Sequence, residues 1–322
     1  MKTISAFSFL FLLLYGCKKA LPDSYYVVPD YIVNATGNDQ KYYEAYDKTM
    51  TLWNVDYKDL YIPTSHGTAH VIISGPENAQ PLVLLHGMTA SSTMWYPNAK
   101  ALSKDYRLYA IDLIIEPGKS KLTKDFNSID ELIHWYDEVF IALKLDEFSL
   151  IGVSRGGWLA VNILLNNQQH KIKSLVLISP AQTLIWIPPS ENLIKNIIYQ
   201  LSSDEKRMYL TFTTLSEDVD NIEEEYLRQN YLGDQIDSNN KFVIGMQPYS
   251  SQELQSIKVP TLVLIGDDDL MNNSRSLEVA QKNIPNVTTQ TVSNAGHFLS
   301  VDQAEEVNNK ILMFLDNIYQ KD

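Results

Sequence analysis

The sequence predicts an α/β protein with a mostly parallel, twisted sheet that is flanked by helices and interrupted by one helical insertion. Apolar runs with strand character alternate with helix-like runs from about residue 57 to 180 and again after residue 260. Residues 81–85 and 261–265 are continuously apolar, as is typical of strands covered on both faces. Strands that alternate with helices are joined by right-handed crossovers, which produce a parallel sheet.

Composition and charge limit the class of protein. A chain of 322 residues that is 45% hydrophobic can bury a large core, so one α/β domain with an insertion is sufficient. The formal net charge of −13 and the isoelectric point near 4.9 disfavour nucleic acid and anionic membrane surfaces as electrostatic partners. Cys17 is the single cysteine, so no disulfide forms within the chain.

The first residues have the features of a targeting signal. Lys2 supplies a positive charge, and residues 4–15 form an apolar run too short to span a bilayer. Leu14-Tyr15-Gly16-Cys17 resembles the lipobox of bacterial lipoprotein signals. The resemblance implies removal of residues 1–16, lipid attachment at Cys17 and an anchor on the extracytoplasmic side of a bacterial envelope membrane. A plain secretory signal and a buried core segment are the alternatives.

A polar stretch separates this signal from the folded part of the chain. Residues 18–40 lack a strong hydrophobic period and contain Pro22, Pro29 and Gly37. We therefore expect residues 17–40 to form a tether and the folded domain to begin near residue 41.

The first part of the domain is expected to contain a helix, a hairpin and further alternating elements. In order, these are a helix over 42–53, strands over 57–62 and 69–73, a strand over 81–85, a helix to about 103, a strand over 106–112, and a helix from Asn127 or Ser128 to about 143. His66 and His70 lie on the hairpin, where exposed or hydrogen-bonded histidines are favoured over metal ligands. His134 is expected on the surface of the last helix.

The most informative motif is Gly152-Val153-Ser154-Arg155-Gly156. It lies between an apolar strand pattern over 148–153 and a helix-like run to about 167, so Ser154 occupies the turn between them. Glycines two positions before and after a serine allow a sharp turn that exposes the hydroxyl, which is the nucleophile-elbow arrangement. The alternative is a Gly/Ser turn without chemistry.

The buried strand over 81–85 ends in His86-Gly87-Met88-Thr89, which resembles the His-Gly oxyanion loop of α/β-hydrolases. The resemblance implies that the backbone N–H groups of Met88 and Arg155 stabilise a negative oxygen on the acyl carbon. Gly87 is then a substrate-contacting position, and His86 orders the loop. A simple glycine turn is the alternative.

Residues 181–260 follow a strand over 174–179 and have a mostly helical pattern. An insertion at this place would lie over Ser154 as a cap. Trp186 is one of its apolar residues that could line a substrate pocket, although each of these residues could instead belong to the small core of the cap.

The last part of the domain carries an acid and a histidine. Gly266-Asp267-Asp268-Asp269 follows the strand over 261–265, and the Gly-x-x-Asp pattern of the family selects Asp269, with Asp268 as the second choice. A calcium loop is disfavoured because Met271 and Asn272 stand where an oxygen ligand and a glycine are needed. A helix over 276–282, a strand over 287–292, a loop containing His297 and a helix over 304–318 complete the chain.

The order Ser154, Asp269, His297, together with the His86-Gly87 loop, resembles the α/β-hydrolase superfamily over residue 41 to the C-terminus. The core then comprises residues 41–180 and 261–322, and the cap comprises residues 181–260. Residues 43–53, 69–75 and 85–98 resemble a group of capped bacterial hydrolases described as carboxylesterases.

The loop over 113–120 departs from the Arg-Gly-x-Gly-x-Ser sequence of many relatives. We expect this loop to lie away from the triad and to affect the shape of the pocket more than the chemistry.

The resemblance implies a serine hydrolase that cleaves carboxylic esters of small to medium size through an acyl-enzyme, without a metal or organic cofactor. Activity should fall at low pH, because only neutral imidazole can act as the base. A serine at position 154 argues against the dehalogenase and epoxide-hydrolase branches, which have aspartate there. Thioesters, lactones, amides and carbon–carbon bonds remain alternative substrates, and a non-catalytic binding protein on this scaffold is the alternative outside enzymes.

Overall fold

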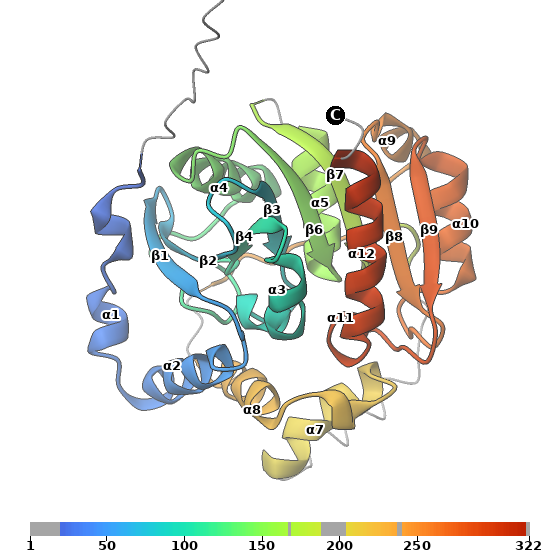
Figure 1. Cartoon of the computed structure of the whole chain (residues 1–322). Coiled ribbons are helices and arrows are strands. Elements are labelled where there is room, and N and C mark those ends of the chain that lie inside the picture. The colour runs from blue at the N-terminus through green and yellow to red at the C-terminus, as the bar shows by residue number, and fades with distance from the viewer. Residues whose placement is uncertain (1–19, 167–168, 188–203, 237–239, 320–322) are drawn as a thin grey trace, which may run out of the picture.

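The structure is a computed structural model that describes residues 20–166, 169–187, 204–236 and 240–319 (Figure 1). The predicted signal peptide and Cys17 lie outside the described residues. The strands are β1 (Tyr57–Thr64), β2 (Gly67–Ser74), β3 (Gln80–Leu85), β4 (Tyr106–Ile111), β5 (Lys121–Leu122), β6 (Glu147–Val153), β7 (Lys171–Ile178), β8 (Thr261–Gly266) and β9 (Val287–Val292).

The helices cover both faces of the sheet and one of its ends. They are η1 (Asp23–Tyr26), α1 (Asp30–Val33), α2 (Gly37–Met50), η2 (Ser92–Trp95), α3 (Tyr96–Leu102), α4 (Ile129–Ala142), α5 (Arg155–Asn166), α7 (Asp204–Leu215), η3 (Val219–Asn221), α8 (Glu224–Gly233), α9 (Ser251–Ser256), α10 (Ser274–Asn283), α11 (Leu299–Asp302) and α12 (Ala304–Tyr319).

One sheet organises the molecule. Its strand order is β1-β2-β4-β3-β6-β7-β8-β9, and β5 pairs with β2. The pairings from β4 through β3, β6, β7 and β8 to β9 are parallel, whereas β1 with β2 and β2 with β4 are antiparallel. This confirms the predicted mostly parallel sheet flanked by helices. The carboxyl ends of the parallel strands therefore meet at one edge, where side chains distant in sequence come together.

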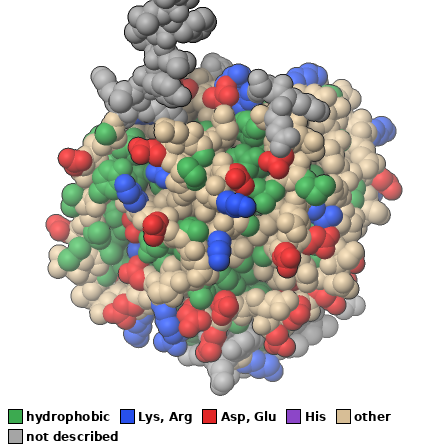
Figure 2. All heavy atoms as spheres, viewed as in Figure 1, with side chains coloured by type: hydrophobic (Ala, Val, Ile, Leu, Met, Phe, Trp, Pro, Cys, Tyr) green, Lys and Arg blue, Asp and Glu red, His purple; other side chains and the backbone are tan. Residues whose placement is uncertain are grey.

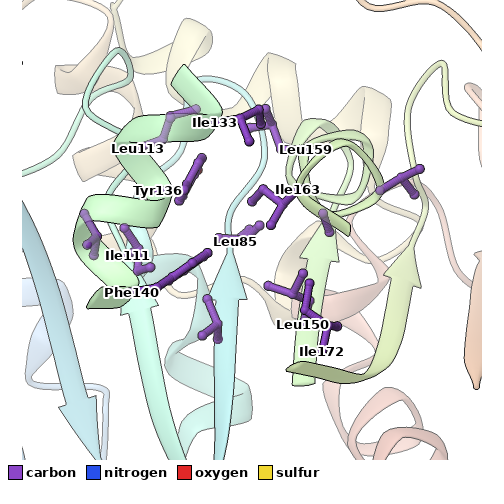
Figure 3. Packing of buried hydrophobic residues seen from close by; sticks show 14 of the residues in the cluster. Leu85, Ile111, Leu113, Ile133, Tyr136, Phe140, Leu150, Leu159, Ile163 and Ile172 are labelled. Atoms are coloured by element: carbon purple, nitrogen blue, oxygen red, sulfur yellow. The ribbon is translucent and has the colours of Figure 1, made fainter. Parts of the chain in front are cut away.

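Two hydrophobic layers sandwich the sheet. On one face, α4 and α5 pack against β3, β4 and β6, as Figure 3 shows for residues such as Leu85, Tyr136 and Ile163. On the other face, α3 and α12 pack against the alternate residues of the same strands, including Leu84 and Ile151. Both sides of the central strands are fully buried, which explains why their sequences are continuously apolar.

The amino-terminal part of the described chain differs from the predicted tether. Residues 23–26 and 30–33 form the short helices η1 and α1, and α2 already begins at Gly37. Leu21 and Tyr25 pack against the core, and the Tyr31 hydroxyl donates to the Lys119 carbonyl at 2.8 Å. A few scattered anchoring contacts hold this segment to the domain, and such contacts leave no period in the sequence.

The insertion between β7 and β8 contributes α7 and α8, which lie beyond the carboxyl edge of the sheet in the lower part of Figure 1. Helix α8 packs against α2, and Phe212 of α7 contacts Phe298 at a ring separation of 4.9 Å. The described part of this insertion therefore covers the edge of the sheet at which β6, β8 and β9 end.

The surface carries mixed charge. Figure 2 shows acidic and basic side chains interspersed over one face, without a single field of either sign. Within the described ranges, none of the helices is long and apolar enough to cross a membrane.

A buried charge network occupies the antiparallel side of the sheet. The His70 ring donates from Nδ1 to Asp112 and from Nε2 to Asp59, each at 2.8 Å, so the ring carries both protons. Burial opposes the charge on His70, but the two carboxylates outweigh it and raise the pKa of His70 above its ordinary value. The pKa of Asp112 is correspondingly lowered although its side chain is fully buried.

This network gives a prediction for stability. A raised histidine pKa stabilises the fold fully below pH 6.5, and this contribution is lost as the pH rises through the pKa of the folded state. His70→Gln should therefore lower the free energy of unfolding by about 3 kcal/mol at pH 6, with a smaller loss at pH 9. Urea denaturation at the two pH values measures this difference.

His134→Gln is the matched control, because His134 is exposed on α4, and it should change the unfolding free energy by less than about 0.5 kcal/mol at either pH. An equal loss for His70→Gln at both pH values would contradict the charged state of this ring.

Candidate active site

Ser154 stands at the carboxyl end of β6, in the turn that leads directly into α5. Its backbone has φ 52°, a left-handed conformation that is uncommon for a residue with a side chain. The Ser154 N–H donates to the Ile178 carbonyl at 2.9 Å, which ties the turn to the neighbouring strand β7. The conformation matches the sharp turn that the sequence predicts between strand and helix, and it directs the hydroxyl beyond the edge of the sheet.

The two glycines of the motif are required by close backbone packing. A Cβ atom at Gly152 would collide with the Gly156 carbonyl, and one at Gly156 would collide with the Leu85 carbonyl and lie 2.6 Å from the His86 oxygen. Helix α5 therefore approaches the end of β3 more closely than any side chain would allow. The glycines fix the separation between Ser154 and the loop that follows β3.

His297 and Asp269 complete a hydrogen-bonded chain with Ser154. The His297 Nε2 atom lies 2.9 Å from Ser154 Oγ, and its Nδ1 atom lies 3.0 Å from Asp269 Oδ1. Asp269 follows the end of β8 and His297 follows the end of β9, so the parallel sheet brings the three together. Asp268, the second choice from sequence, is exposed and does not occupy this position.

The environment of Asp269 keeps its carboxyl group ionised. Burial disfavours the charge, but attraction to His297 and hydrogen bonds from His297 and the Met271 N–H outweigh it, so the pKa of Asp269 is lowered. The Asn272 N–H also donates to the carboxylate, at 3.3 Å. Asn272 Nδ2 donates to the second carboxylate oxygen at 3.1 Å. These donors orient the carboxylate that accepts the proton on His297 Nδ1. Met271 and Asn272, which do not fit a calcium-binding loop, thus serve here as hydrogen-bond donors to Asp269.

The loop after β3 faces Ser154. A Cβ atom built at Gly87 would lie 3.5 Å from the Ser154 Cβ atom, so Gly87 leaves open the space beside the hydroxyl. The N–H groups of Met88 and Arg155 donate to no acceptor among the described residues, and Arg155 is the first residue of α5, where helix N–H groups lack intrahelical partners. Two such donors beside a serine can hold an oxyanion.

Buried polar groups hold this loop in place. His86 accepts a hydrogen bond from the Leu113 N–H at 2.9 Å and donates to the Gly87 carbonyl, in keeping with its predicted ordering role. Asp112 accepts from the Ser92 N–H at 2.7 Å. From the cap, Asn230 of α8 donates to the Thr89 carbonyl at 2.9 Å.

The loop over 113–120 does not lie away from the site, contrary to the expectation from sequence. Glu116 pairs with the Arg155 guanidinium, and its other oxygen accepts from the Thr89 N–H at 2.9 Å. The same loop lines a cavity of about 260 Å³ with Tyr43 and Gly233. The loop therefore contacts both chain segments that flank Ser154, which its sequence alone does not indicate.

Other residues singled out from sequence lie elsewhere. Trp186, near the start of the insertion, is 64% exposed. His66 stacks on Phe126, and His70 belongs to the buried charge network. In the part of the chain that the structure describes, no group of three or more potential ligands could hold a metal ion.

Comparison with known proteins agrees with this geometry. The profile of the α/β-hydrolase fold family matches residues 80–234 and 223–304. The chain is 33% identical to an uncharacterized carboxylesterase named nap from Bacillus subtilis, over 88% of this chain and 95% of the relative. It is also 33% identical to carboxylesterase YbfK of the same organism, over 85% of this chain and 93% of the relative.

Among solved structures, naproxen esterase (carboxylesterase NP) from B. subtilis superposes with a TM-score of 0.79 at 32% identity, covering 87% of this chain and 99% of the other. The region matched by the family profile includes β3, β6, the turn at Ser154 and the loops that carry Asp269 and His297. The chain therefore belongs to the α/β-hydrolase fold family.

Proposed function

We propose that this protein is a serine carboxylesterase that hydrolyses small to medium carboxylic esters through an acyl-enzyme intermediate. The observation that carries the proposal is the continuous chain of hydrogen bonds from Asp269 through His297 to the hydroxyl of Ser154. The names of the two B. subtilis relatives, both carboxylesterases, support the ester as the substrate class.

The proposed acylation step begins at the Ser154 hydroxyl. His297 Nε2 removes its proton as Ser154 Oγ attacks the ester carbonyl, and Asp269 stabilises the imidazolium that forms. The resulting oxyanion accepts hydrogen bonds from the N–H groups of Met88 and Arg155. His297 then gives its proton to the departing alcohol.

Deacylation repeats these roles with water as the nucleophile. His297 removes a proton from water, the oxyanion forms again between the same donors, and the acid leaves as Ser154 recovers its proton. Each half-reaction needs neutral His297 at its start, which is why we expect activity to fall at low pH.

We further propose that Cys17 carries a lipid that anchors the mature protein to an envelope membrane. The lipobox-like Leu14-Tyr15-Gly16-Cys17 supports this, as does the position of the single cysteine in the chain. Ala20, three residues later, accepts a hydrogen bond from Lys144, which shortly precedes the amino end of β6, whereas Ser154 follows its carboxyl end. An anchored molecule would thus hold its catalytic edge away from the attachment point.

The first prediction of the proposed function concerns the nucleophile. A fluorescent fluorophosphonate should label the wild-type protein, and Ser154→Ala should abolish labelling because it removes the hydroxyl that His297 activates. Gel fluorescence measures the result, and the exposed Ser251→Ala variant should label like wild type. A folded wild-type protein that does not label would favour a binding role without catalysis.

The second prediction separates the two candidate acids. Asp269→Asn should lower kcat for a p-nitrophenyl ester by about 10³ to 10⁴-fold, because an amide cannot stabilise the imidazolium and favours the wrong tautomer of His297. Asp268→Asn should keep kcat within about twofold, since the Asp268 side chain is exposed. Steady-state kinetics at pH 8 tests both, and the reverse pattern would assign the acid to Asp268.

A substrate panel tests the ester assignment itself. Wild-type protein should hydrolyse p-nitrophenyl esters with a higher kcat/KM than thioesters or lactones of the same acyl group. Turnover of a thioester or lactone with no measurable ester hydrolysis would overturn the carboxylesterase proposal while leaving the triad intact.

The fourth prediction of the proposed function concerns the lipid anchor. Cells that express the protein and are fed an alkyne analogue of palmitate should incorporate the label, and Cys17→Ser should remove it because the chain has no other cysteine. Click fluorescence of the purified protein measures incorporation. An unlabelled wild-type protein, or label that persists in Cys17→Ser, would refute lipid attachment at this residue.

A further inference from the structure

Glu116 bridges the two chain segments that flank the Ser154 hydroxyl. One of its carboxylate oxygens accepts from the Thr89 N–H at 2.9 Å, and the other pairs with the Nη1 group of Arg155. Thr89 directly follows Met88, and Arg155 directly follows Ser154. A single side chain therefore joins Arg155 to the residue that follows Met88, and Met88 and Arg155 are the oxyanion donors of the proposed function.

The two charged groups of the bridge are largely buried, so removing one of them would leave the other without its partner. The Glu116 side chain is 6% exposed and that of Arg155 is 15% exposed, and burial lowers the pKa of Arg155 to about 10. The second terminal nitrogen of Arg155 contacts Met88 Sδ at 2.6 Å. Arg155 thus touches the Met88 loop directly and also reaches it through Glu116.

The loop needs such support because its backbone is strained. Thr89 has φ 55°, a left-handed conformation in a residue with a branched side chain. Its N–H is held by Glu116 and its carbonyl by Asn230. These two bonds fix the Met88–Thr89 and Thr89–Ala90 peptides, and the bond from His86 Nδ1 to the Gly87 carbonyl holds the preceding peptide, which carries the Met88 N–H.

We propose that Glu116 is a positioning residue that sets the spacing and direction of the two oxyanion donors, acting through Thr89 and Arg155 and not by contact with substrate. This inference rests on the proposed esterase mechanism. Because the oxyanion forms in the transition state, a displaced donor lowers kcat and leaves substrate binding nearly unchanged.

Two substitutions of graded severity test the role. Glu116→Gln keeps the size of the side chain and one acceptor but loses the charge that pairs with Arg155, and it should lower kcat by about 10-fold with KM within twofold. Glu116→Ala removes both bonds and should lower kcat by about 100-fold. The rate of phosphonylation of Ser154 by a fluorophosphonate should fall by the same factors, because that adduct also places an oxygen between the donors.

The matched control is Glu147→Gln. Glu147 pairs with Lys171 and Lys173 at the amino end of β6, at the opposite end of the strand from Ser154. It should leave kcat and the phosphonylation rate within twofold of wild type. Thermal unfolding of all variants, with kinetics measured well below each Tm, separates loss of stability from loss of positioning.

A double-mutant cycle identifies the route. If Glu116 acts partly through Arg155, then Glu116→Gln should slow an Arg155→Met background by less than it slows wild type. A folded Glu116→Ala variant with wild-type kcat and phosphonylation rate, or with a loss confined to KM, would overturn the inference. A wild-type protein without ester turnover or labelling would instead overturn the proposed function.

Discussion

The left-handed turn at Ser154 is the constraint on which the rest of the site depends. It is held by the bond from the Ser154 N–H to the Ile178 carbonyl and by the absence of side chains at Gly152 and Gly156. Because α5 presses against the end of β3 through bare backbone, the distance between the hydroxyl and the His86-Gly87 loop is set by backbone packing. The position of the Ser154 hydroxyl is therefore set by the backbone of the sheet and α5. The neighbouring loops must in turn be fixed relative to that hydroxyl.

Buried acceptors hold those loops. The segments after β3 and β4 lie side by side without regular strand pairing, and three side chains replace it. His86 accepts from Leu113, Asp112 accepts from Ser92, and Glu116 accepts from Thr89. A buried carboxylate is costly unless a cation compensates it, and here His70 faces Asp112 while Arg155 faces Glu116. Because each carboxylate has a cationic partner, Asp112 and Glu116 can remain charged in buried positions. There they accept hydrogen bonds from the backbone N–H groups of Ser92 and Thr89.

The contrast between a nucleophile fixed by the sheet and loops fixed by single side chains explains what the sequence could and could not predict. Period and composition located the parallel strands, and the Gly-x-Ser-x-Gly pattern together with the ends of β8 and β9 pointed to Ser154, an acid and His297, because a parallel sheet brings such ends together. The choice of Asp269 over Asp268 came from the resemblance to the Gly-x-x-Asp pattern of α/β-hydrolases. Glu116 could not be found in this way. Its role depends on where a loop folds back in space, and a glutamate before a proline has no pattern that reveals it.

The same reasoning applies to the amino terminus. Residues 20–40 lack a period because they are held by isolated contacts such as Tyr31 to Lys119, so the sequence resembled a tether. His70 was expected to be an exposed or hydrogen-bonded strand histidine, and it is hydrogen-bonded at both ring nitrogens, but the sequence did not identify its partners. Its partners, Asp59 and Asp112, lie 11 and 42 residues away, and only the strand pairing brings them to its two ring nitrogens.

The insertion between β7 and β8 is hydrogen-bonded to both loops that flank Ser154. Helix α7 ends against the histidine loop, where the Leu215 carbonyl accepts from the Phe298 N–H at 3.0 Å. Helix α8 holds the oxyanion loop through Asn230 and through Gln229, which bonds to Ser91 and Thr93. Helices α7 and α8 are thus bonded to the loops that carry His297 and Met88. A substitution that shifts α7 or α8 would also shift the loops bonded to them. We therefore expect kcat and KM to change together when residues of these helices are exchanged.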